Sequence, residues 1–264
     1  MSVSLLLVVD LGAPRALAGA PFGGDDLGFV PPDKPTLACE RAVATNVAKL
    51  IHAVTICHVK SADAGIKNKT FDETACESAG RAKYDHGNSK LTGCPACLDP
   101  GMVADGEVGR LDGIAAALVY CDATSGKPLA DGDDSGFVPA NRTAGKCQNL
   151  VTRRIASLAT RLIKCHNTFA TAALKSGTLD QASEDACESA ALAKYTAYVG
   201  ALRNCPACLT PVLATLGAGA VASLNVNGGD VYCGSPSGAF LDVFPRRATP
   251  RGCRPSRGPS DIES

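Results

Sequence analysis

The feature that most constrains this chain is an internal duplication that carries twelve of its thirteen cysteines. The stretch GFVP at 28–31 recurs at 136–139, and ACESA at 75–79 recurs at 186–190. Self-similarity sustained over about a hundred residues indicates two copies of one structural unit. The cysteines form two matching sets of six: Cys39, Cys57, Cys76, Cys94, Cys97 and Cys121, then Cys147, Cys165, Cys187, Cys205, Cys208 and Cys233.

The duplication divides the chain into four segments. We expect a weak or truncated secretory signal and leader at 1–23, helical repeats at 24–132 and 133–241, and a disordered basic Pro/Arg-rich tail at 242–264. The leader has a short apolar run and a small-residue site that suits cleavage before Gly19, although no basic residue precedes the run. A disordered N-terminus is the alternative interpretation of the leader.

Composition narrows the location and the partners. Thirteen cysteines favour an oxidising compartment, so we expect an extracytoplasmic protein, periplasmic or secreted. The formal net charge of zero argues against a nucleic-acid or anionic-membrane partner. Apart from the leader, no stretch approaches the ~18 apolar residues of a transmembrane span. A protein or a surface ligand stays open as a partner.

Several motifs carry a family resemblance. The runs CERAVATNVAKL, CHVKSADAG, FDETACESA, AKYD and LTGCPACL resemble a cysteine-rich tandem helical repeat found in secreted proteins predicted from environmental bacterial genomes. The resemblance covers both repeats, residues 25–235, and is closer in the first. It implies export, and it implies no activity, cofactor or partner.

Helical geometry explains the cysteine spacing. Cys39 and Cys57 lie 18 residues apart, which is five α-helical turns, so both fall on one face with an apolar stripe between them. Cys76 and Cys94 have the same spacing, and so do the equivalent pairs of the second repeat. We therefore predict an all-α fold of two tandem, disulfide-stapled antiparallel hairpins, each with a short third helix. The third helices are expected over 102–112 and 212–224, and Asn227-Gly228-Gly229 is expected to break the second.

Antiparallel pairing predicts the turns and the bonds. The turns should lie near Gly65 and Asn68 and at Ser176-Gly177, with Asp72 and Asp180 capping the next helices. The spacing leaves open whether Cys39 pairs with Cys94 or with Cys97. The predicted disulfides are Cys57–Cys76, Cys39–Cys94 and Cys97–Cys121, then Cys165–Cys187, Cys147–Cys205 and Cys208–Cys233.

The two CPAC motifs, at 94–97 and 205–208, have chemical alternatives to a cross-link. A c-type haem needs a histidine directly after the motif, where Leu98 and Leu209 stand. A thioredoxin-like centre needs a helix N-terminus, whereas we expect the motif at a helix C-terminus, where the dipole raises a thiol pKa. A Cys₄ zinc site from Cys39, Cys94, Cys97 and Cys121 is the stronger rival.

Other candidate residues are given structural interpretations. DGDDSG at 131–136 resembles the start of a calcium loop, but Arg142 stands where the loop requires Glu, so we interpret it, like Asp25-Asp26, as a solvated linker. We expect His58 and His166 to be partly exposed structural histidines. Tyr84 and Tyr195 are expected in the core. Cys253 has no duplicated partner and is predicted to be a free thiol.

These observations predict a non-enzymatic, exported structural or binding protein whose repeats each fold alone. We expect no cofactor, no metal ligand and no catalytic residue. The alternative is a metal-binding protein with structural Cys₄ zinc, or a thiol-redox protein that uses the CPAC motifs.

Overall fold

The computed structural model describes residues 20–130 and 134–234. The cleavage site before Gly19, the tail over 242–264 and Cys253 lie outside the described residues. The prediction of an all-α fold is confirmed, because helices dominate and the described residues hold a single two-stranded sheet.

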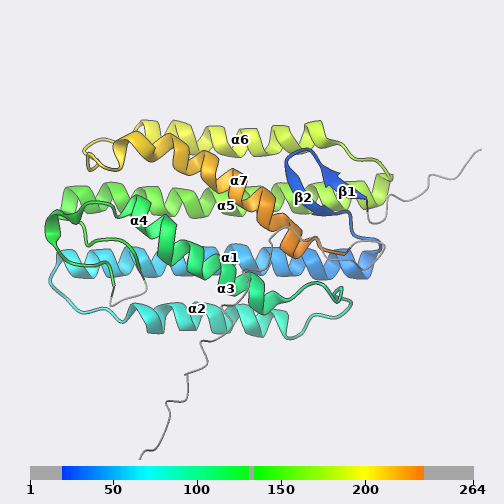
Figure 1. Ribbon diagram of the computed structural model, residues 1–264, viewed down its shortest axis with the longest axis horizontal. Coiled ribbons are helices and arrows are strands. Elements are labelled where there is room, and N and C mark those ends of the chain that lie inside the picture. The colour runs from blue at the N-terminus through cyan, green and yellow to red at the C-terminus, as the bar shows by residue number, and fades with distance from the viewer. Residues whose placement is uncertain (1–19, 131–133, 235–264) are drawn as a thin grey trace, which may run out of the picture.

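Four helices lie side by side in one layer, in the order α2, α1, α5, α6 (Figure 1). The two central helices are long, and a shorter helix flanks each of them. Their bounds are α1 Lys34–Ile66, α2 Glu73–Asn88, α5 Arg142–Ser176 and α6 Gln181–Gly200.

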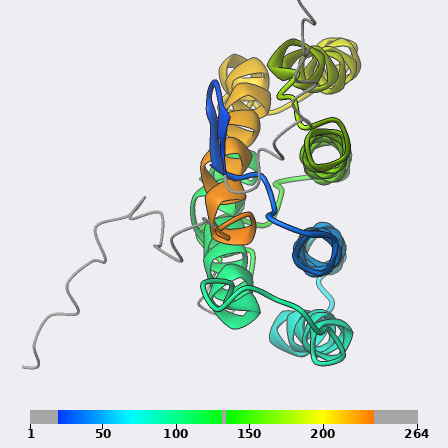
Figure 2. The same cartoon turned by 90° about the vertical axis from the view of Figure 1, so that its right-hand side faces the viewer.

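A second layer crosses one face of the first (Figure 2). It contains the third helix of each repeat and the N-terminal hairpin. The bounds are β1 Pro21–Gly23, β2 Asp26–Phe29, α3 Pro100–Arg110, a π-helical turn Leu111–Ala115, α4 Ala116–Val119 and α7 Leu213–Val231, with 3₁₀ turns at Ala123–Ser125 and Thr210–Val212.

The predicted break at Asn227-Gly228-Gly229 is wrong, because α7 continues to Val231. A Cβ on Gly228 would lie 3.1 Å from the backbone oxygen of Leu27, so the glycine lets the strand β2 pack closely on the helix. In this sequence the glycine serves a close approach between backbones and does not end the helix.

The predicted turns and N-terminal caps agree with the structure. Asp72 accepts a hydrogen bond from the backbone N–H of Ala75 at 2.8 Å, and Asp180 accepts one from Ser183 at 3.1 Å. Gly177 follows α5 with a φ of 68°, a left-handed conformation that glycine adopts without strain. Asn68 turns the chain after α1 with a φ of 51°.

The apolar stripes of α1 and α5 form the centre of the core. Val43, Val54, Val151 and Leu162 are each fully buried, and burial of one such side chain stabilises the fold by about 1.5–3 kcal/mol. Among the described helices, α1 has the length and composition to cross a membrane, but 61% of its most apolar stretch is buried by the rest of the protein. That burial is typical of a core helix.

Tyr84 and Tyr195 lie in the core, as predicted. Their hydroxyl groups donate hydrogen bonds to the backbone oxygens of Pro100 and Leu213, at 2.8 and 3.0 Å. Each tyrosine therefore fixes the start of the second-layer segment that crosses above it.

Four disulfides lie within a single repeat. Cys57–Cys76 and Cys165–Cys187, each with Cα atoms 5.8 Å apart, are the predicted pairs. Cys39–Cys94 and Cys147–Cys205, each with Cα atoms 5.2 Å apart, are also as predicted.

The predicted Cys97–Cys121 and Cys208–Cys233 bonds are wrong. The structure instead joins Cys97 to Cys233 and Cys121 to Cys208, so both bonds cross between repeats. The physical reason is the crossing of the second layer. In Figure 1 the end of α7 reaches the start of α3, and the end of α4 reaches the start of α7.

The position expected for the CPAC motifs is also wrong. They follow α2 and α6 in loops and do not lie on the helix ends. Gly93 and Asn204 directly precede the two motifs with φ values of 72° and 59°, so the chain turns there.

The GFVP segments bind across the repeats as well. Phe29 donates its backbone N–H to the carbonyl of Tyr232 at 2.7 Å, and Phe137 donates to Tyr120 at 2.8 Å. Each repeat thus donates a backbone hydrogen bond to the C-terminal end of the other repeat's last helix. We expected each repeat to fold alone on the basis of bonds within it. These hydrogen bonds and the two cross-repeat disulfides join the repeats to each other.

Candidate metal centres

Four carboxylates surround the buried His58 of α1 and form the first cluster with it. The Cys57–Cys76 bond holds this part of α1 against the start of α2. Glu73 and Glu77 lie one helical turn apart on α2 and so project from the same face. Their Oε1 atoms lie 3.8 and 3.3 Å from His58 Nε2.

Two aspartates from other segments complete this first cluster. Asp112 lies in the π-helical turn, a local distortion that is frequent at functional sites. Its Oδ1 lies 3.2 Å from His58 Nε2, and Asp134 Oδ1 lies 3.1 Å away. The interpretation of 131–136 as a solvated linker is therefore wrong for Asp134, which is only 8% exposed.

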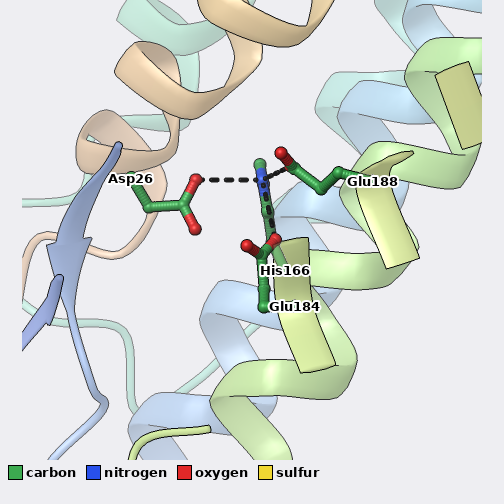
Figure 3. A group of neighbouring side chains, drawn as sticks. All are labelled: Asp26, His166, Glu184 and Glu188. Atoms are coloured by element: carbon green, nitrogen blue, oxygen red, sulfur yellow. Dashed lines mark hydrogen bonds and ion pairs between the residues drawn. The ribbon is translucent and has the colours of Figure 1, made fainter. Parts of the chain in front are cut away.

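A second cluster surrounds His166 on α5 (Figure 3). Glu184 and Glu188 on α6 approach His166 Nε2 to 3.6 and 2.8 Å. Asp26 comes from β2 on the opposite side, at 3.4 Å, so it too is no solvated linker residue. Asn225 on α7 donates a hydrogen bond to Glu188 Oε2 at 3.0 Å.

The two clusters use equivalent positions of the duplicated sequence. His166, Glu184 and Glu188 recur at the offsets that relate His58, Glu73 and Glu77 to the second repeat. Each cluster also takes one aspartate from the other repeat. Asp134 of the second repeat joins the first cluster, and Asp26 of the first repeat joins the second cluster. The expectation of partly exposed histidines is wrong, since His58 and His166 are 2% and 4% exposed.

Many carboxylate oxygens in both clusters lack a hydrogen-bond donor. One imidazole N–H cannot satisfy three or four carboxylate groups, and an unpaired buried charge is costly. The buried oxygens that accept no hydrogen bond are both Oδ atoms of Asp26, both Oε atoms of Glu73, Oε1 of Glu77, both Oδ atoms of Asp134 and Oε1 of Glu184. Each cluster therefore holds more buried carboxylate oxygens than its own donors satisfy.

The clusters retain protons in the absence of a cation. Burial lowers the pKa of His58, but the hydrogen bond to Asp112 and the negative charge of Asp134 outweigh it and raise the pKa to about 12. Burial, together with the negative charges of Asp134 and Glu77, raises the pKa of Glu73 to about 9. Near neutral pH, His58 is therefore an imidazolium and Glu73 a neutral acid.

The second cluster behaves in the same way. Burial lowers the pKa of His166, but the negative charge of Asp26 and the hydrogen bond to Glu188 raise it to about 10. Burial and the charges of Asp26 and Glu188 raise the pKa of Glu184 to about 9. A metal ion would displace these protons, because metal ligands bind in their deprotonated forms.

The spacing of the donor atoms fits a metal ion. The ligand atoms of Asp26, His166, Glu184 and Glu188 all lie within 4.8 Å of one another, and the same limit holds in the first cluster for two overlapping groups that share His58. Donors at ~2.1 Å from the metal are about 3.4 Å apart in a tetrahedral site and about 3.0 Å apart at neighbouring positions of an octahedral site. The distances between histidine and carboxylates, 2.8 to 3.8 Å, bracket both values.

The cysteines named as alternative metal ligands are all disulfide-bonded. Cys39 and Cys94 pair with each other, while Cys97 and Cys121 bond to the second repeat. The two cysteines of each CPAC motif have different partners, whereas a thioredoxin-like centre joins them to each other. These bonds leave no thiolates for a Cys₄ zinc site.

Comparison with known proteins found no matching family model, no similar curated protein and no matching solved structure. The clusters are therefore interpreted from their own geometry and chemistry.

Proposed function

We propose that this protein is an exported, non-enzymatic metal-binding protein that holds one divalent transition-metal ion in each of its two histidine–carboxylate clusters. The observation that carries the proposal is the set of buried carboxylate oxygens without a donor, arranged around one histidine nitrogen in each repeat. A cation at the centre of each cluster would compensate this charge.

The donor set favours Mn²⁺ or Fe²⁺. Each cluster offers one imidazole nitrogen and three or four carboxylates, and carboxylate-rich sites suit Mn²⁺ while imidazole also suits iron. Zn²⁺ is a competitor, since histidine and carboxylate ligands bind it as well. Ca²⁺ is disfavoured because it takes six to eight oxygen ligands.

Export belongs to the same proposal. The six disulfides are consistent with an oxidising extracytoplasmic compartment. We propose that residues 1–23 contain the secretory signal and that the family resemblance, which implies export, reflects true kinship. N-terminal sequencing of protein recovered outside the cytoplasm should begin at Gly19.

Metal content tests the function directly. The full chain, isolated from an oxidising compartment, is freed of metal with a chelator at mildly acidic pH and then titrated with Mn²⁺, Fe²⁺ or Zn²⁺. We expect two equivalents of metal per chain by elemental analysis after gel filtration. The variant E73Q/E77Q should bind one, and so should E184Q/E188Q.

A matched control separates ligand loss from damage to the core. Glu40 is fully buried and lies outside both clusters, so E40Q makes the same chemical change without removing a proposed ligand. E40Q should keep two equivalents. A wild-type protein that is folded and fully disulfide-bonded but retains none of the three metals would overturn the proposal.

A further inference from the structure

A cavity of about 300 Å³ lies where helices of both layers meet. Its walls are mostly aliphatic and come from α1, α3, α5 and α7. They include Val47, Val103, Ile163, Leu224 and Val231. Met102 also lines the cavity and is 72% exposed, so it marks the rim.

The related position in the first repeat is almost filled. There a cavity of about 20 Å³ lies beside Tyr120, whereas the large cavity lies beside the equivalent Tyr232. The lining residue Ala44 is replaced by Thr152 in the small cavity, and Gly228 by Ala116. The open space is therefore specific to one of two related places and does not follow from the fold alone.

The polar side chains that line the large cavity are Glu107, Arg110, Asn227 and Asp230, together with His166 of the second cluster. Glu107 is buried and accepts hydrogen bonds from Arg110 and from Asn227, the latter at 2.7 Å. Burial and the charge of Glu107 raise the pKa of Asp230. One donor remains, because the buried Nε of Arg110 has no hydrogen-bond partner.

We propose that this cavity binds an uncharged, largely apolar small molecule that carries one hydrogen-bond acceptor. A cavity of about 150 Å³ accommodates benzene, so twice that volume suits about twelve non-hydrogen atoms. The aliphatic walls supply the affinity, and Arg110 supplies the donor for the acceptor atom. An anion would meet the buried carboxylate of Glu107, and a cation would meet Arg110 and the imidazolium of His166. His166 belongs to the second cluster as well, but the proposal rests on the aliphatic walls and Arg110 and needs no metal ion.

Gly106 allows the cavity to be filled selectively. It lines the cavity from α3, and a Cβ at this position would meet no atom within 4 Å. Because Gly106 is a lining residue, we expect the leucine of G106L to narrow the cavity, and its Cβ displaces no neighbour. Gly109 lies on the same helix, has equally free space and does not line the cavity, so G109L is the matched control.

The test measures binding of the uncharged fluorophore 1-naphthol, whose hydroxyl oxygen accepts a hydrogen bond, to the full-length chain. We expect saturable binding at one site, displacement by 1-decanol and much weaker displacement by decanoate. G106L should weaken the affinity at least tenfold, and G109L should leave it unchanged, with both variants checked by thermal unfolding.

Three outcomes would overturn the proposal. The first is no saturable binding by the wild-type chain. The second is equal affinity in G106L and wild type, which would place the fluorophore elsewhere. The third is displacement by decanoate as effective as that by 1-decanol, which would rule out a preference for uncharged ligands.

Discussion

Asp26 and His166 belong to opposite repeats, yet Asp26 Oδ1 lies 3.4 Å from His166 Nε2. Asp134 and His58 stand in the same relation at 3.1 Å. In both cases the aspartate lies just before a GFVP segment. The phenylalanine N–H of that segment donates a hydrogen bond to the tyrosine carbonyl at the C-terminal end of the other repeat's last helix. The short N-terminal hairpin is thus a structural part of the second cluster.

This exchange predicts which cluster each aspartate serves. D26N should weaken metal binding at the His166 cluster by at least about tenfold, because a charged ligand is replaced by a neutral one. It should leave the His58 cluster unchanged, and D134N should do the reverse. Competition titrations against a metal chelator, with each variant combined with E73Q/E77Q or E184Q/E188Q, report the two sites separately. Equal weakening of both sites by D26N would contradict the assignment.

The cross-repeat disulfides give a second prediction. Non-reducing peptide mapping should recover Cys97 linked to Cys233 and Cys121 linked to Cys208. Long loops of this kind stabilise a fold by ~4–5 kcal/mol in the loop-entropy model. The double variant C97S/C233S should therefore unfold at a clearly lower temperature while the other five bonds form. A peptide that joins Cys97 to Cys121 would show that the repeats close separately.

The two kinds of disulfide show how far the sequence alone can predict this fold. Cys57–Cys76 and Cys165–Cys187 follow from helical periodicity and the position of one turn, which are local properties. The partner of Cys97 depends on how α3 and α7 cross the four-helix layer. That crossing is a tertiary property, and helical periodicity does not encode it.

Only some residues of each cluster can be predicted from the sequence. His58 and His166 recur at equivalent positions, and so do the glutamates of each pair, Glu73 with Glu77 and Glu184 with Glu188. These glutamate pairs, repeated in and just before ACESA, indicate that both repeats hold the same set of ligand residues. Burial of the histidines and the arrival of an aspartate from the other repeat could not be predicted, because both depend on packing between distant segments.

The raised pKa values predict how pH affects stability. In the metal-free protein, the pKa values of His58, Glu73, His166 and Glu184 all lie above their ordinary values. The native state therefore binds more protons than the unfolded state across about pH 5–9, so the free energy of unfolding should fall as pH rises. The stability these groups contribute is fully present at low pH and is lost as pH passes their native pKa values.

Metal ions should reverse this trend. Because bound metal replaces the protons, the increase in melting temperature with excess Mn²⁺ should grow from pH 5 to pH 8. Thermal unfolding followed by circular dichroism, with and without Mn²⁺, measures both trends. A melting temperature of the metal-free protein that rises steadily over this range would contradict the assigned protonation.

The last prediction compares Glu40 with its equivalent in the second repeat, Gln148. Both side chains are fully buried, and Gln148 donates a hydrogen bond to the carbonyl of Val119 at 2.9 Å. Burial raises the pKa of Glu40 to about 8, and neither of its carboxyl oxygens has a hydrogen-bond partner. The stability contributed by the neutral acid is therefore lost as pH rises through 8.

E40Q places the side chain of the second repeat in the first and cannot ionise, so it should stabilise the fold by at least about 1 kcal/mol at pH 9 and by little at pH 5. Chemical denaturation of both proteins at these two pH values checks the difference. The reciprocal variant Q148E should lose stability with rising pH, and a pH-independent effect of E40Q would mean that Glu40 does not titrate in this range.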